Sequence, residues 1–309
     1  MSGVDVVARR LAAQHLDLRL PASSWRRAAR SGLQDGAPRS VVLALHARAE
    51  GVTPDAWEDP AFAQVWGPRG AVFVVPVEDV AAFTLGLLSR DASVRASAER
   101  DADALAAALG ADRVRKREAL PAVGGRVASL LAASTTGRIR LRWDGRDTLV
   151  WVVPAPDVEP ETARTELARR FLDAYGPSTA DGFARWAGLP PAEVRATWSP
   201  GASSPTTDTA TPSGVRLLPP GDPFLLSPDR ELLVPDDARR RAVWPRGTPQ
   251  PGALLVDGEF AGTWRRRGHR VDVTPFGPLT RGTRRSAEEE AAGFPLDLAR
   301  EVEVRWLAG

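Results

Sequence analysis

The stretch GRIRLRWDGRDTLVWVVP, residues 137–154, is the clearest local structure in the sequence. Arginines alternate with apolar residues in its first half, and Asp144-Gly145 in the middle is a dipeptide preferred by two-residue hairpin turns. Successive side chains of a strand point to opposite faces, so the pattern predicts a β-hairpin with one apolar and one basic face. The basic face carries Arg138, Arg140 and Arg142.

Helical patterns precede this hairpin. Apolar residues recur at helical spacing in residues 4–15 and 22–33, and again after Pro38, which stands at the first position of the expected helix. A short buried strand is expected at residues 70–76, and a charged, alanine-rich helix at 93–109. Helices followed by a hairpin are the pattern of a winged helix, and the basic face of the hairpin would be the outer face of its wing.

The second half of the chain combines a helical region, a linker and a region of short strands. Residues 160–198 predict three helices, the middle one capped by Ser178 or Thr179 and ended by Gly188, which favours a helix-turn-helix. Residues 199–214 are rich in Ser, Thr, Pro and Gly and predict a linker. Beyond the linker, short strands separated by Gly and Pro predict a small β-barrel or sandwich, so the fold class is α+β.

Composition excludes several classes of protein. With 309 residues, 43% of them apolar and 26% charged, the chain is typical of a globular protein with two or more compact units. No apolar run reaches the roughly eighteen residues of a membrane span. The N-terminus lacks the apolar core of a signal peptide, so we expect a cytoplasmic protein. Without cysteine there is no disulfide or thiolate chemistry.

The charges are unusual in kind rather than in sum. The net charge is +2, but of 41 basic residues only Lys116 is a lysine. A GC-rich coding sequence explains this bias most simply, while guanidinium forks also suit bidentate contacts with phosphates and base edges. The single lysine lies in a charged run, which argues against Schiff-base catalysis. Three scattered histidines with no cysteine predict no metal site, and no cofactor is expected.

Residues 31–40, SGLQDGAPRS, raise a specific question about function. Gln34 and Asp35 stand between an arginine-rich helix and the apolar run that follows Pro38. One interpretation is a solvated turn in which Asp35 caps the next helix. The other is a pair of polar side chains held at the mouth of a site. Spacing alone favours the turn.

Four stretches together resemble one family in their order and spacing. They are GLQDGAPRSVVLALHAR, LARRFLDAYGPSTADGFARWAGL, VRLLPPGDPFLL and LLVDGEFAGTWRRR. Through them the chain is similar, from near residue 5 to near residue 306, to the bacterial winged-helix proteins that include the AlkZ and YcaQ DNA glycosylases. The resemblance implies tandem winged-helix units, a C-terminal β-barrel and a positive concave surface that holds duplex DNA. The units expected are 1–92 with the Gln34 motif, 93–156 with the basic wing, 157–214 with a reduced third wing and the linker, and 215–309 with the barrel.

The resemblance also implies a catalytic motif. Characterised members hydrolyse the N-glycosidic bond of alkylated purines. Their signature is a Gln, one intervening residue, then Gln or Asp, with Pro-Arg close behind. Aligning Pro38-Arg39 places Gln34 on the first position and Gly36 on the second, so this chain keeps one half of the pair. Asp35 is the only nearby carboxylate that could compensate.

Charge pattern and resemblance together give a set of candidate DNA contacts. TWRRRGHR, residues 263–270, predicts a second hairpin tip, and its five basic residues in six positions favour nucleic-acid contact over an exposed turn. The alternatives are a solvated strand face for the wing arginines and a structural ion pair for Arg69. Trp264 is expected in the core. The candidates are Arg39, Arg69, Arg138, Arg140, Arg142, Arg265, Arg266, Arg267, His269 and Arg270.

Two functions from different classes remain. The preferred one is a monofunctional DNA glycosylase, a hydrolase acting on bulky or alkylated N7-type purine adducts in duplex DNA, for instance as self-resistance to a genotoxic natural product. The alternative is a non-catalytic winged-helix DNA-binding protein, a regulator or an adduct-sequestering relative, because Gly36 replaces the second catalytic residue. A regulator needs twofold symmetry for half-sites, and no dimer face is evident. We therefore expect a monomer that binds double-stranded DNA and no membrane, and is nucleoid-associated when bound.

Overall fold

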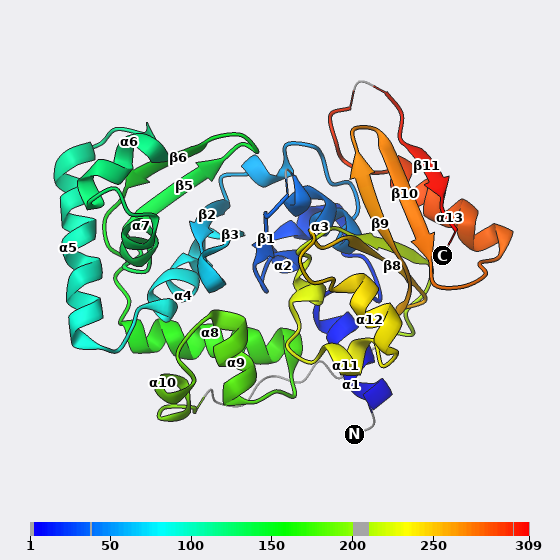
Figure 1. Ribbon diagram of the computed structural model, residues 1–309, viewed down its shortest axis with the longest axis horizontal. Coiled ribbons are helices and arrows are strands. Elements are labelled where there is room, and N and C mark those ends of the chain that lie inside the picture. Colours follow the sequence, from blue (N-terminus) through cyan, green and yellow to red (C-terminus); the bar gives the residue numbers. More distant parts are fainter. Residues whose placement is uncertain (1–2, 38, 200–209, 299, 309) are drawn as a thin grey trace.

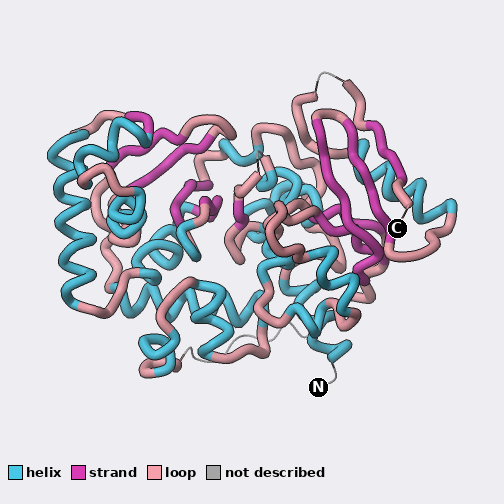
Figure 2. The backbone as a smooth tube through the Cα atoms, viewed as in Figure 1, coloured by secondary structure: helices cyan, strands magenta, loops and turns pink. Residues whose placement is uncertain are grey.

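The computed structural model describes residues 3–37, 39–199, 210–298 and 300–308. Helices alternate with strands that form two separate sheets, which confirms the predicted α+β class (Figure 1, Figure 2). Within the described ranges no helix is long and apolar enough to cross a membrane. The predictions for Pro38 and for linker residues 200–209 lie outside the described residues.

The first sheet has six strands in the order β1-β3-β2-β5-β6-β4. Its strands are β1 (Leu33–Gln34), β2 (Phe62–Trp66), β3 (Val72–Pro76), β4 (Val114–Arg115), β5 (Ile139–Trp143) and β6 (Thr148–Val152). β2 and β5 pair through Gln64 and Leu141, and the Gln64 Oε1 accepts a hydrogen bond from the Trp143 backbone N at 2.6 Å. The strands before residue 92 and those after it therefore belong to one sheet.

The β5–β6 hairpin confirms the strand pattern predicted from the alternating residues in 137–154. Ile139 and Leu141 are buried, whereas the arginines between them are only partly buried. The expected two-residue turn is wrong, because the last paired residues are Trp143 and Thr148, which leaves four connecting residues, 144–147. The Asp144 carboxylate accepts the backbone N–H groups of residues 146 and 147 at 2.8 and 2.7 Å, and these bonds stabilise the wider turn.

Seven helices of the described residues lie before residue 135 in the chain. They are α1 (Gly3–Ala13), α2 (Trp25–Ala28), α3 (Ser40–Arg48), α4 (Val80–Thr84), α5 (Ala92–Leu109), α6 (Lys116–Ala119) and α7 (Val127–Ser134). α5 matches the helix predicted at 93–109, and its start is fixed by Asp91, whose carboxylate accepts from the backbone N–H groups of Ser93 and Val94. The strand predicted at 70–76 is β3.

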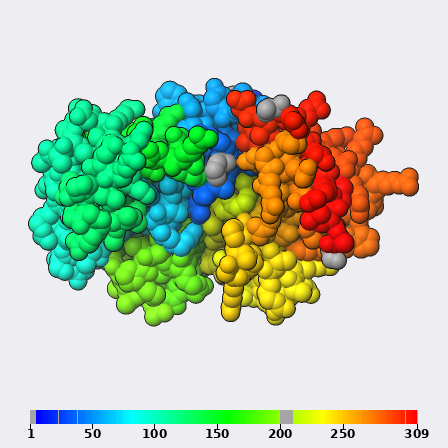
Figure 3. Space-filling model, turned by 45° about the horizontal axis from the view of Figure 1, so that its top comes forward, coloured from blue at the N-terminus to red at the C-terminus, as the bar shows by residue number. Residues whose placement is uncertain are grey.

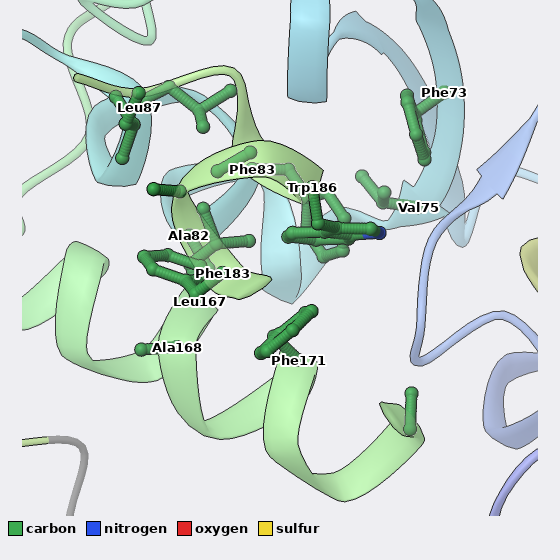
Figure 4. Packing of buried hydrophobic residues seen from close by; sticks show 14 of the residues in the cluster. Phe73, Val75, Ala82, Phe83, Leu87, Leu167, Ala168, Phe171, Phe183 and Trp186 are labelled. Carbon is green, nitrogen blue, oxygen red and sulfur yellow. The ribbon is translucent and has the colours of Figure 1, made fainter. Parts of the chain in front are cut away.

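A three-helix group follows, as predicted, and packs under the first sheet. Its helices are α8 (Pro160–Tyr175), α9 (Ala180–Ala187) and α10 (Pro191–Arg195). The Thr179 hydroxyl caps α9 by accepting from the Gly182 backbone N at 3.1 Å, and Gly188, with φ 78°, ends it. Aromatic rings from α8, α9, α4 and β3 meet in one core, whose members include Phe73, Phe83, Phe171, Phe183 and Trp186 (Figure 4).

The C-terminal sheet has five strands in the order β11-β10-β9-β8-β7. They are β7 (Val215–Leu218), β8 (Gly252–Val256), β9 (Glu259–Arg267), β10 (Arg270–Pro275) and β11 (Glu303–Trp306), with helices α11 (Arg230–Leu233), α12 (Asp237–Val243) and α13 (Arg281–Ala292). The prediction of a closed barrel is wrong, because β7 and β11 remain separate edges of the sheet in the part of the chain described. α13 contacts both edge strands, and its Ala287 and Ala291 lie in the same apolar core as Val215 and Val273, so a helix occupies the place where strands would close.

A buried ion pair joins the two halves of the molecule. The Arg48 guanidinium, at the end of α3, donates to both carboxylate oxygens of Asp222 at 2.7 Å, and both side chains are 0% exposed. The same guanidinium also donates to the Ala44 carbonyl oxygen and to the Gln14 Oε1. Because the charges are paired and hydrogen-bonded, the interior tolerates them.

We expect Arg48→Met to lower the free energy of unfolding by about 3–5 kcal/mol, because the change leaves the Asp222 charge buried without a partner. Arg195→Met is the matched control, since it removes an exposed pair, Arg195–Asp181, and should cost at most about 1 kcal/mol. Urea unfolding of both variants checks this. Equal losses in the two variants would contradict the role given to the buried pair.

Candidate functional site

Gln34 lies at the end of β1, where the strand pairs with Phe73 of β3. Its carboxamide lies beside two glycines: a Cβ on Gly36 would come within 3.0 Å of the Gln34 Nε2, and one on Gly221 within 3.2 Å. The side chain is half-buried, and its Oε1 is buried without a hydrogen-bond partner among the described residues. A buried acceptor with no partner is costly in a folded protein, so this oxygen is a strong candidate for contact with a ligand.

Asp35 has a different environment from its neighbour. The residue is 1% exposed, and its Oδ1 accepts from the Ser40 hydroxyl at 3.2 Å and from the Val41 backbone N at 3.3 Å. Asp35 therefore caps the first turn of α3, which is the structural alternative considered from the sequence. Burial raises the pKa of this carboxyl to about 6, and its Oδ2 has no partner in the described part of the chain.

The wall opposite Gln34 comes from a segment far along the chain. Gly221, with φ 74°, forms the turn after β7, a backbone conformation that favours glycine. The next residue, Asp222, is the one held by Arg48, and its Oδ1 also accepts from the Phe224 backbone N. The buried ion pair thus fixes the turn that closes over the carboxamide.

Two candidate arginines share one aromatic ring next to this motif. The guanidinium carbon of Arg39 lies 4.0 Å from the ring centroid of Trp57, and that of Arg142 lies 4.5 Å from it. The Arg39 Nη2 donates to the Asp144 carbonyl oxygen at 3.1 Å, and the Arg142 Nη2 lies 2.8 Å from the Glu58 carboxylate. Trp57 therefore connects the residues after Gln34 with the β5–β6 hairpin.

The other two arginines of the hairpin face have protein partners. Arg138 forms ion pairs with Asp103 at 2.6 Å and Glu99 at 3.6 Å on α5. Arg140 donates to the carbonyl oxygens of Gly137 and Ile139, and burial lowers the pKa of its guanidinium. Phosphates could reach Arg138 only in competition with these carboxylates.

The second basic hairpin tip is the β9–β10 turn. Arg267 pairs with Arg270 across the turn, Arg265 donates to the Pro249 carbonyl oxygen at 2.8 Å, and Arg266 donates to that of Gly268. The Arg270 guanidinium lies 3.8 Å from the Glu303 carboxylate. Arg265, Arg267 and Arg270 are exposed, and His269 is half-buried. Trp264 is 2% exposed and donates to the Leu218 carbonyl oxygen, which confirms its expected place in the core.

Arg69 lies in the short 3-10 helix η3 (Pro68–Gly70) that precedes β3. Its φ is 58°, which is unusual for a residue other than glycine. The side chain is exposed, and its Nη1 donates to the Trp186 carbonyl oxygen at 2.5 Å. Surrounding protein lowers the pKa of the guanidinium. The structural ion pair considered from the sequence is not formed with any described residue.

The predicted residues fall into two groups in space. Arg39, which follows Gln34 in the chain, and Arg142 meet at Trp57, whereas residues 265–270 belong to the β9–β10 hairpin of the other sheet. Figure 3 shows a hollow between the green surface of β5–β6 and the orange surface of β9–β10, with blue N-terminal surface between them. Sequence reasoning missed Trp57, Glu58 and Gly221, because each reaches the site through contacts between segments distant in sequence. Among the described residues, no three His, Asp or Glu side chains gather as a metal site would require.

Comparison with known proteins gives the family. Residues 9–295 match the family described as DNA glycosylase AlkZ-like. The chain belongs to this family. The resemblance seen in the sequence is thereby confirmed, and the family is one of DNA glycosylases, which are hydrolases.

Two relatives carry the comparison further. The Interstrand DNA cross-link repair glycosylase of Streptomyces sahachiroi is 28% identical over 160 residues, 43% of this chain and 42% of the relative, so the aligned part spans about two fifths of that protein. The solved structure of Streptomyces sahachiroi DNA glycosylase AlkZ matches with a TM-score of 0.72 at 19% identity, and the match covers 99% of this chain and 100% of that one. This second likeness shows that the two chains share a fold.

The raised pKa of Asp35 predicts a pH-dependent stability. Because the folded pKa of about 6 lies above the ordinary 3.8, the ionised carboxylate is disfavoured in the fold, and wild-type protein loses stability as pH rises from about 4 to 6. Asp35→Asn removes this titration and keeps the capping oxygen. We expect its unfolding free energy to exceed that of wild type by about 3 kcal/mol at pH 8, and by much less at pH 4. Thermal unfolding at both pH values measures this difference, and a gap that does not change with pH would refute the assignment.

Proposed function

We propose that the protein is a monofunctional DNA glycosylase that hydrolyses the N-glycosidic bond of bulky or alkylated N7-type purine adducts in duplex DNA. The observation that carries this proposal is the Gln34 carboxamide, whose buried oxygen has no described partner at the end of β1. Membership of the DNA glycosylase AlkZ-like family supports the same reaction. The name of the Streptomyces sahachiroi relative, a cross-link repair glycosylase, extends the proposed substrates to cross-linked adducts.

The reaction needs little acid catalysis from the protein, so a site with one polar group can support it. An N7-alkylated purine is already cationic and leaves with the electrons of the glycosidic bond. A water molecule then forms the new bond to C1′ and releases a proton to solvent. The role of Gln34 is to stabilise the positive charge that develops on the sugar and to orient this water by hydrogen bonding.

The second position of the motif decides the rate of this enzyme. Gly36 brings no side chain, and Asp35 is engaged with the first turn of α3. We therefore propose a slow hydrolase for labile adducts. The missing side chain at Gly36 and the capping role of Asp35 also favour the second candidate, a non-catalytic DNA-binding relative that sequesters adducts or acts as a regulator.

The proposal includes an architecture and a setting. We propose that residues 1–92, 93–156 and 157–214 are winged-helix units, with β5–β6 as the second wing, and that 215–309 form the C-terminal β-rich unit. Duplex DNA would lie in the hollow between the two basic hairpins, contacted by Arg39, the wing arginines and residues 265–270. We further propose a cytoplasmic monomer that associates with the nucleoid when bound to DNA, and a role in resistance to a DNA-damaging natural product.

The direct test is release of N7-methylguanine from duplex DNA, revealed as abasic sites by alkali. We expect Gln34→Ala to lower the rate by about 10²- to 10⁴-fold while the affinity for undamaged duplex stays unchanged. Gln250→Ala is the matched control, because Gln250 also carries a buried amide atom without a partner among the described residues. Binding of duplex without any release, even at high protein concentration, would favour the non-catalytic candidate.

Restoring the missing half of the motif gives a second test. In Gly36→Gln, the new Cβ would lie 3.0 Å from the Gln34 Nε2, a flexible end that can shift, and the φ of residue 36 requires no glycine. We expect the release rate to rise about 10- to 100-fold, because one more positioned group acts on the sugar and water. Gly36→Ala, which adds only the Cβ, should give no increase. Equal rates for both variants would show that position 36 does not limit turnover.

A further inference from the structure

Arg69 and Arg230 belong to the arginines that have no carboxylate partner among the described residues. In the described part of the chain, Arg138 and Arg142 pair with acidic side chains, but neither Arg69 nor Arg230 has a carboxylate oxygen within 4.0 Å. Both side chains are exposed. Exposed guanidinium groups that lie close together without counterions create a positive potential that attracts an anion.

Arg69 has an unusual backbone conformation and packs against α9. Its φ of 58° is rare for an arginine, and a Cβ on Gly188 would lie only 3.2 Å from the Arg69 Cα, so α9 packs directly against this residue. One of the five guanidinium N–H donors is used on the Trp186 carbonyl oxygen. Strained residues of this kind concentrate at functional sites. Arg69 is thus fixed by its backbone while most of its donors stay available.

The segment that leads to Arg230 lies at the other end of the same helix. A Cβ on Gly182, in the first turn of α9, would lie 3.6 Å from the Pro228 Cγ, so the segment that leads to Arg230 packs there. The guanidinium carbon of Arg230 lies 5.2 Å from the ring centroid of Trp244. The carboxylate just before it, Asp229, is already paired with Arg10 at 2.8 Å. Asp229 is therefore not free to pair with Arg230, and the charge of the next residue, Glu231, acts on Arg230 without a direct ion pair in the described part of the chain.

The two cations influence each other. Partial desolvation lowers the pKa of Arg230, the charge of Arg69 lowers it further, and the charge of Glu231 raises it. α9 has eight residues, a length of about 12 Å, and arginine side chains extending from its two ends can approach a common ligand. A single anion between them would remove the repulsion and fill the open donors.

The pair is also connected to Gln34 through the chain. Arg69 precedes β3, whose Phe73 pairs with Gln34, and Arg230 follows the turn of Gly221 that lies against the Gln34 carboxamide. We infer that Arg69 and Arg230 form a binding site for a backbone phosphate of the DNA strand that presents its nucleotide to Gln34. This inference rests on the proposed function. A phosphodiester suits the site, because it is a monoanion with two free oxygens for two planar forks.

The test measures affinity for undamaged duplex as a function of salt concentration. Variants are Arg69→Gln, Arg230→Gln and the double change, with the double variant Arg195→Gln/Arg285→Gln as control for an equal loss of net charge at exposed ion pairs. Each lost phosphate contact lowers the slope of log K against log salt by about 0.9. We expect about tenfold weaker binding at low salt for each single variant of the pair. The control should keep the wild-type slope.

A second measurement locates the phosphate and protects against effects of misfolding. A neutral methylphosphonate is placed at each backbone position around an N7-methylguanine in turn. At one position it should weaken wild-type binding about tenfold and leave the affinity of Arg230→Gln unchanged, while Arg230→Lys, which keeps the charge, should retain the response. A wild-type slope in the double variant, or equal sensitivity of wild type and Arg230→Gln at every position, would overturn the inference. Failure of base release with these binding effects intact would overturn the proposed function alone.

Discussion

The pairing of Arg48 with Asp222 is the interaction on which the site depends. Helix α3 and the turn after β7 are separated by more than 170 residues in the chain, and two hydrogen bonds of 2.7 Å between fully buried side chains join them. A bidentate guanidinium–carboxylate contact fixes orientation as well as distance. Gly221 is thereby held against Gln34, and the polar motif becomes a site with two walls instead of a loop on the surface. The energy of a buried pair is modest when both partners remain, so its main effect here is geometric.

Local patterns in the sequence predicted local structure well. Alternation in residues 139–143, the cap at Thr179 and the glycine at 188 each describe contacts within a few residues, and the structure has all three. Gln34 could be singled out only through the family resemblance, since spacing favoured a turn. The open C-terminal sheet and the partners of Arg138 depend on packing between distant elements, which no period in the sequence encodes. The four-residue turn after Trp143 depends instead on hydrogen bonds to the Asp144 carboxylate. Asp35 could be predicted only in part. Its capping role was one of two interpretations of the sequence, and the hydrogen bonds in the structure identify it.

The pairing of arginines with carboxylates bears on the proposed DNA binding, because the net charge of the chain is only +2. Its arginines fall into those that already hold a carboxylate, such as Arg142 with Glu58, and those that do not, such as Arg69. A phosphate that meets the first kind must replace an existing partner, so the net gain is small. A phosphate that meets the second kind makes a new contact with no such loss. Affinity would then concentrate on few residues, and the remaining basic surface would guide the duplex.

The continuity of the first sheet has a mechanical consequence. β2 and β5 share a register at Gln64 and Leu141, and Trp57 contacts arginines from both regions, so the basic hairpin and the segment bearing Gln34 are joined by direct contacts. Under the proposed function, a framework joined in this way would leave bending and unstacking to the DNA, and adducts that already distort or soften the double helix would be recognised at a lower energetic cost than intact base pairs.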